Sequence, residues 1–301
     1  MALSDSLRAW LQIHFCVILW GFTAILGKAI TLPALPLVWW RMTLVTAALL
    51  VIPRFWRDLA RLSTRQIAIF AGIGAVVAMH WLTFYGAIKL SNASVAATCM
   101  ALAPVLISII EPVIVGRRFE VRELFFGIAV VPGIALVVGG TPEAMRSGIA
   151  VGVLSAFFVA VFGSLNKRFV DRGGALGITG LEMGAGSAFL LLAAPLMPKS
   201  ETPFVMPNRH DAILLFVLAI GCTLLPFALS LVALRHLTAF TTGLAVNMEP
   251  VYAILLAMIV FGEQRELSLA FYLGVAIVFA VVFSHPLLTR VSRPVASNTR
   301  M

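Results

Sequence analysis

Ten apolar stretches of about twenty residues fill this 301-residue chain, and each is long enough to cross a hydrocarbon core of ~30 Å as a helix. Hydrophobic residues make up 61% of the chain and charged residues 12%, which leaves too little polar surface to cover a soluble globule. The sequence therefore predicts an all-α membrane protein with ten transmembrane helices. The stretches are 11–30, 33–53, 66–88, 92–115, 121–140, 147–166, 176–197, 211–234, 238–261 and 268–288.

The basic residues predict the orientation, because short loops rich in Lys and Arg stay in the cytoplasm. Fifteen of them lie at the N-terminus, in alternate loops and in the C-terminal tail, and six lie in the other loops. Both termini are therefore expected in the cytoplasm, which requires an even number of crossings. The net charge of +9 is explained by this bias and by contact with anionic membrane lipids, so no nucleic acid partner is expected.

No pattern in the chain predicts a metal ion or another cofactor. Cys16, Cys99 and Cys222 all lie within apolar stretches and form no C-x-x-C pair, so they are expected to be packing residues. The segment from Gly21 to Lys28 imitates a phosphate-binding loop, but its spacing is wrong and it lies in an apolar stretch. An enzyme is therefore not expected.

The chain repeats itself with a shift of 146 residues. This register places Pro104 on Pro250 and Gly116 on Gly262, and it also aligns Ala87, Ala93, Glu120 and Phe125 with identical residues. The shared prolines within helices and glycines at helix ends predict an internal duplication. The two units are residues 1–145 and 146–301.

Each unit holds five predicted helices, and an odd number makes the second unit enter the membrane from the opposite side. Inverted repeats are typical of secondary transporters, which bind a small molecule near the midplane and expose it to each side in turn. We therefore expect two inverted five-helix repeats around a central cavity.

Several motifs resemble the EamA-type branch of the drug/metabolite transporter superfamily. They are the Trp20-Gly21 pair, Arg41, the stretch 87–97 that leads to Pro104, and Pro250 running on to Phe261-Gly262-Glu263 and Gly274. The resemblance implies ten helices in two inverted halves and transport of small metabolites. Within this branch the chain is most similar to bacterial aromatic amino acid exporters of the YddG type. It departs from the family pattern at Gly116-Arg117, where Gly-Glu is expected.

One group of candidate substrate-binding residues lies in the ninth stretch. An ionisable side chain at this depth is costly in lipid, so it is expected to face protein or water. Glu249 lies near the midplane and precedes Pro250, which lacks a backbone donor. Asn247 and Tyr252 accompany it. The alternative is that Glu249 pairs with Arg41 and only holds two helices together.

Aromatic residues form a second group of candidates. Trp20 lies too deep in the first stretch to be an anchor at the membrane surface. Trp81 and Tyr85 are four residues apart and are expected to project together, while His80 points about 100° away. Such an aromatic wall suits a substrate with a ring or a cation, and the alternative is an ordinary contact between helices.

Glu111 and Glu182 are expected to have a structural role. Both lie near the cytoplasmic ends of their stretches, where they can reach water or pair with arginines such as Arg117 or Arg172.

The sequence thus predicts an inner-membrane exporter that moves small metabolites, with aromatic amino acids as the substrate implied by the resemblance. Efflux of hydrophobic organic cations is the main alternative, because a deep acid and aromatic rings suit that substrate equally well. An intramembrane enzyme that uses His80 and Glu249, or a scaffold, leaves the duplication unexplained. Coupling to protons and the oligomeric state stay open.

Overall fold

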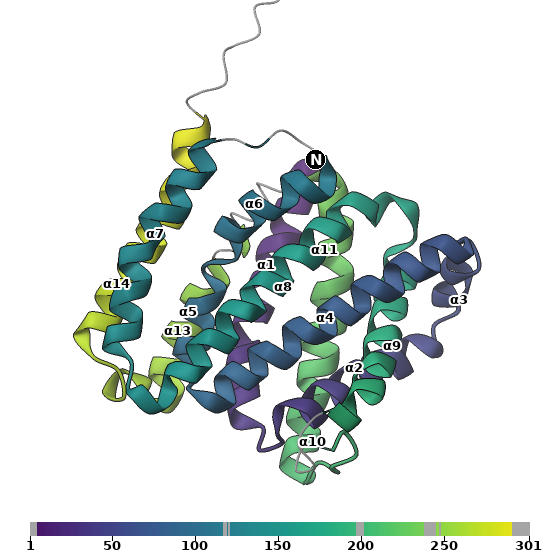
Figure 1. Ribbon diagram of the computed structural model, residues 1–301. Helices are drawn as coiled ribbons and strands as arrows, with labels where there is room; N and C mark the ends of the chain where they lie inside the picture. The colour runs from purple at the N-terminus through teal and green to yellow at the C-terminus, as the bar shows by residue number, and fades with distance from the viewer. Residues whose placement is uncertain are drawn as a thin grey trace, which may run out of the picture.

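The computed structural model describes residues 5–116, 119, 121–196, 202–237, 245–246 and 248–290, and the regular structure within them is entirely helical. The long helices are packed into one bundle (Figure 1). The helices are α1 (Asp5–Ala29), α2 (Ala34–Leu50), α3 (Pro53–Leu59), α4 (Thr64–Leu90), α5 (Ala93–Met100), α6 (Ala103–Val115), α7 (Val121–Gly140), α8 (Arg146–Phe169), α9 (Ala175–Ala193), α10 (Arg209–Phe216), α11 (Leu225–His236), α13 (Met248–Phe261) and α14 (Leu269–Arg290). A π-helical segment, η4 (Val217–Leu224), joins α10 to α11, and short 3₁₀ turns lie at η1 (Glu143–Met145), η2 (Val170–Arg172), η3 (Ala194–Leu196) and η5 (Glu263–Arg265).

Six of the described helical segments are long and apolar enough to cross a membrane, or seven if α2 and α3 are counted as one bent span. Three shorter apolar helices are also present, at Ile128–Gly140, Met248–Phe261 and Leu269–Val281. Each predicted stretch overlaps one of these segments, although residues 238–244 and 247 of the ninth lie outside the described residues. The chain is therefore a helical membrane protein, and the count of ten crossings stays a prediction.

Two predicted stretches are not continuous helices. The stretch 33–53 ends as a helix at Leu50, and the chain turns by 96° into α3. Pro53 causes this break, because a residue that precedes proline avoids the helical region, and Ile52 is extended. The stretch 92–115 is divided into α5 and α6 just before Pro104, which lies in the first turn of α6.

Helix packing relates the two halves of the chain. Helix α4 packs against α8, and α11 packs against α1. In the register of 146 residues, the α10–α11 region is the counterpart of α4, and α1 is the counterpart of α8, so these two contacts correspond to each other. Helices α7 and α14 are also counterparts, and they lie side by side at one edge of the bundle (Figure 1).

Glycines allow α7 and α14 to approach closely. A Cβ atom at Gly274 would lie 2.5 Å from the carbonyl oxygen of Gly133, and one at Gly140 would lie 2.2 Å from the amide nitrogen of Phe271. Both distances are shorter than van der Waals contact, so a larger residue at either position would push the helices apart.

The two glycines that the repeat aligns have the same conformation. Gly116 follows α6 with a φ of 82°, and Gly262 follows α13 with a φ of 69°. A glycine in this left-handed region is a common end of a helix, because it has no Cβ to clash. The prediction that both glycines end helices is confirmed.

Candidate functional site

A cavity of about 190 Å³ lies between helices from both halves of the chain. Its wall is rich in aromatic rings, and polar side chains occur among them. The rings belong to Trp20, His80, Trp81, Phe84, Phe162 and Phe227. The polar residues are Thr23, Arg41, Glu111, Ser164, Asn166, Lys167, Ser230 and Glu249.

Arg41 of α2 is held by contacts with three residues, Thr223, Tyr85 and Trp81. Its Nε donates to Thr223 Oγ1 at 2.6 Å, and its Nη1 donates to the Tyr85 hydroxyl at 2.8 Å. The guanidinium carbon lies 3.7 Å from the centre of the Trp81 ring, within the range of a cation–π interaction. The side chain thus joins α2 to α4 and to η4, and it is only 2% exposed.

The π-helical segment orients Thr223 toward Arg41. The Thr223 hydroxyl donates to the carbonyl oxygen of Leu218, five residues earlier, at 2.6 Å. Its single hydrogen is therefore in use, and the oxygen is left to accept from Arg41. A π-helical turn within an α-helix is rare and is frequently found at functional sites.

His80 of α4 is held by Ser155 of α8. The Ser155 hydroxyl lies 2.8 Å from His80 Nδ1 and 2.9 Å from the His80 carbonyl oxygen, and Nδ1 also lies 3.1 Å from the Ser155 carbonyl oxygen. If the hydroxyl donates to the carbonyl, Nδ1 carries the imidazole proton and Nε2 is an acceptor. His80 Nε2 has no hydrogen-bond partner among the described residues, and the side chain lines the cavity.

Glu249 lies in α13, whose described part begins at Met248; residues 245–246 are also helical, and residue 247 between them lies outside the described residues. Arg41 and Glu249 both line the cavity, but the described structure has no ion pair between them within 4.0 Å. The alternative interpretation, a structural pair of Arg41 and Glu249, is therefore not what this conformation contains.

The structure places Trp20, His80, Trp81 and Glu249 on the wall of the cavity. Asn247 lies outside the described residues. Whether these side chains bind a substrate stays a prediction.

The two predicted tyrosines lie elsewhere. Tyr85 is fully buried behind Arg41, against Gly27, where a Cβ atom would come within 2.3 Å of its ring. Tyr252 packs against Gly21 of α1. Of the expected aromatic wall, Trp81 lines the cavity and Tyr85 does not, although both rings face Arg41. His80 and Phe84 of α4 also line the cavity.

Glu182 also differs from its prediction. It is fully buried in α9, and its Oε2 accepts from Asn166 Nδ2 at 3.4 Å. It makes no ion pair with Arg172, and in the described structure its Oε1 has no hydrogen-bond partner. Glu111, the other glutamate given a structural role, lines the cavity.

Sequence reasoning named Arg41 as a family residue but did not place it in the site. A signal was present, because Arg41 is the basic residue that lies in neither set of loops. Phe227 and Ser230 were also missed. Both lie in an apolar stretch whose composition does not distinguish the face toward the cavity from the face toward lipid.

Comparison with curated protein sequences gave no match. One solved structure, titled only as the crystal structure of a protein, covers 95% of this chain and 99% of its own length with a TM-score of 0.65. Its sequence identity of 19% limits the likeness to the fold. The model of the EamA-like transporter family matches residues 8–139 and again residues 146–285. These two matches cover nearly the whole chain as two repeats, and the protein therefore belongs to the EamA-like transporter family.

Proposed function

We propose that this protein exports small zwitterionic metabolites, with aromatic amino acids as substrates, across the bacterial inner membrane by alternating access. The observation that carries the proposal is that a cation and an acid, Arg41 and Glu249, line one cavity without pairing with each other. A zwitterion can offer its carboxylate to the guanidinium and its ammonium to the glutamate. The aromatic rings around them can stack on the ring of the substrate, which contributes roughly 0.5–1.5 kcal/mol per pair.

Arg41 has a donor left for a substrate. Its Nε and Nη1 are engaged by Thr223 and Tyr85, but Nη2 makes no hydrogen bond to any residue that the structure describes. A guanidinium held by two partners is already oriented, so binding a carboxylate costs little further side-chain entropy.

The shape of the cavity supports transport by alternating access. The cavity reaches Lys167 and Leu234, in the last turns of α8 and α11, but includes no described residue from the last turns of α1 and α4. We infer that its mouth lies at the end that carries the basic segment 167–172, which is expected in the cytoplasm together with both termini. A cavity that opens there would load a substrate for export, and two inverted repeats would supply the opposite opening.

Efflux of hydrophobic organic cations is the second candidate. Glu249 and the aromatic rings favour it, because a cation is attracted by an acid and by the face of a ring. Arg41 opposes it, since the guanidinium would repel a cation in the same cavity.

Counterflow of radiolabelled phenylalanine, tryptophan, choline and paraquat into proteoliposomes tests the proposal. Each substrate is measured with and without a pH gradient, and the gradient reveals any coupling to protons. We expect flux of phenylalanine and tryptophan. Flux of paraquat alone would establish the second candidate, and no flux of any of the four would refute both.

Two variants assign roles within the cavity. Arg41→Gln should lower amino acid flux at least about tenfold, because the amino acid has a carboxylate. It should not lower paraquat flux, because the guanidinium only repels a cation. Glu249→Gln should lower paraquat flux more than amino acid flux. Glu143→Gln, which makes the same charge change at an exposed residue, is the control. Equal losses with both substrates in both cavity variants would contradict this assignment.

A further inference from the structure

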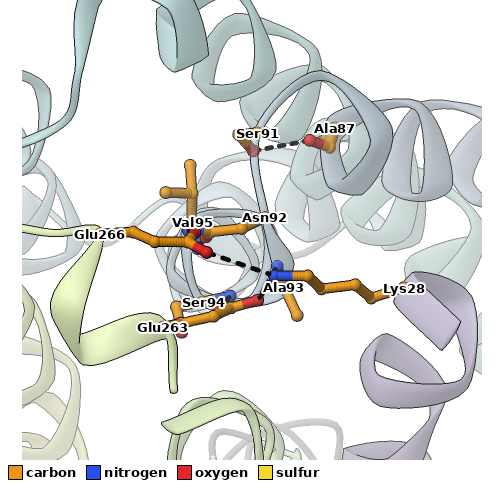
Figure 2. Close-up of polar contacts among 9 residues, drawn as sticks. All are labelled: Lys28, Ala87, Ser91, Asn92, Ala93, Ser94, Val95, Glu263 and Glu266. Atoms are coloured by element: carbon orange, nitrogen blue, oxygen red, sulfur yellow. Dashed lines mark hydrogen bonds and ion pairs between the residues drawn. The ribbon is translucent and has the colours of Figure 1, made fainter. Parts of the chain in front are cut away.

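Glu263 is buried at the end of the bundle opposite the mouth of the cavity. Its side chain is fully inaccessible to solvent and accepts three hydrogen bonds (Figure 2). Oε1 accepts from the amide nitrogen of Ala93 at 3.0 Å and from Lys28 Nζ at 2.7 Å. Oε2 accepts from the amide nitrogen of Ser94 at 2.7 Å.

The beginning of α5 explains why a carboxylate lies there. The first amide groups of a helix have no partner within the helix, and the dipole makes this end positive. The Asn92 side chain accepts from the amide of Val95 at 3.0 Å. The two amides before it, of Ala93 and Ser94, donate to Glu263. In addition, Asn92 Nδ2 donates to Glu266 Oε2 at 2.9 Å. The left-handed turn at Gly262 begins the short segment that carries both glutamates.

This cluster joins three parts of the chain that are far apart in sequence. Glu263 follows α13 of the second half, Ala93 and Ser94 begin α5 of the first half, and Lys28 lies in the last turn of α1. The cavity stops short of it. Thr23, the cavity residue of α1 nearest to this end, precedes Lys28 by five residues, or about 7.5 Å of helix.

We propose that Glu263, Lys28 and the amides of Ala93 and Ser94 form a latch that closes this end of the cavity and has to release in each transport cycle. The proposal rests on the proposed function of alternating access. In the closed state both oxygens of the buried Glu263 carboxylate accept hydrogen bonds, and Lys28 balances its charge. A buried charge is stable only with such partners. In an open state water would form hydrogen bonds with the carboxylate, the ammonium and the two amides. These groups would therefore have hydrogen-bond partners in both states.

A cysteine reporter at Thr23 tests the latch without any substrate. Thr23→Cys is made in a protein whose Cys16, Cys99 and Cys222 are replaced by alanine, and labelling with a membrane-impermeant maleimide is measured from each side of oriented vesicles. With the latch intact, we expect labelling from the side of Lys167 and little from the side of Glu263.

Glu263→Gln should raise the rate of labelling from the Glu263 side at least about tenfold, the factor that corresponds to one hydrogen bond to a charged group. Lys28→Gln should raise it less, because both amide bonds remain. Glu143→Gln changes the same charge at an exposed residue of the same end and should match the parent.

An unchanged rate in Glu263→Gln, with labelling from the Lys167 side preserved, would refute the latch and leave Glu263 as a helix cap. If Glu263→Gln does not fold, Lys28→Gln decides, and an unchanged rate there refutes the proposal. Fast labelling of the parent from the Glu263 side would also refute it. Because labelling requires no transport, failure of the counterflow assay and failure of the latch are separate results.

Discussion

Replacing Arg41 with lysine keeps the positive charge but removes the planar group that makes three contacts at once. One ammonium at the end of a flexible chain cannot reach both Thr223 and Tyr85 in the same geometry, so at least one charged hydrogen bond is lost. Such a bond contributes about 1.5–3 kcal/mol. In the parent protein the guanidinium carbon lies 3.7 Å from the centre of the Trp81 ring. Weaker stacking of the lysine on this ring increases the expected loss by about 0.5–1 kcal/mol.

The expected loss for Arg41→Lys is therefore about 2–4 kcal/mol, a factor of roughly 30 to 1,000 in an equilibrium constant. Tryptophan binding to the purified protein measures how much of the loss falls on the site, and thermal unfolding in detergent measures how much falls on the fold. Arg61→Lys, at an exposed position before α4, is the control. An Arg41→Lys protein that keeps both its melting temperature and its tryptophan affinity within about threefold would refute this account of the site.

Three further predictions concern the stability of the fold and are measured by unfolding in detergent. Gly74→Ala should destabilise by about 1–3 kcal/mol, because the new Cβ would lie 2.2 Å from the carbonyl oxygen of Glu182. Gly72→Ala on the same helix is the control, because its new Cβ would have no atom within 4 Å, and it should be neutral or stabilising by up to about 1 kcal/mol. Equal effects of the two substitutions would contradict the close packing of α4 on α9. Gly262→Ala should cost about 1–2 kcal/mol through its positive φ alone, since its Cβ would meet no neighbour, and a neutral result would be inconsistent with this backbone conformation. Ser155→Ala should cost about 1–3 kcal/mol by removing the hydroxyl that holds His80, whereas an unchanged melting temperature would mean that this contact is not maintained.

The length and composition of the apolar stretches predicted helix in the described part of every stretch, because a backbone in lipid has to satisfy its own hydrogen bonds. The same reasoning could not predict the bend after Leu50 or the break before Pro104. Proline indicates that a helix can be interrupted, but packing decides whether it kinks, breaks or continues. The two glycines at 116 and 262 were predictable, since the repeat gave two independent observations of one helix end.

The candidate site was only partly predictable. Depth along a helix identified Trp20, Trp81 and Glu249 as residues that need a protein or water environment, and they line the cavity. The rotation of a helix about its axis is not determined by depth, which is why Tyr85 was assigned to the wall while it is buried behind Arg41. In a soluble protein the pattern of polar residues would indicate this rotation, but both faces of a membrane helix are apolar.

The capping of α5 by Glu263 has a consequence for biosynthesis. About 170 residues of the chain separate Ala93 from Glu263, and at about 5–20 residues per second a ribosome needs roughly 10–35 s to make them. During this time two amides at the start of α5 lack the partner that they have in the finished protein. The cap of α5 is thus completed only when Glu263 of the second repeat has been made, so the first half of the chain depends on the second half for this contact.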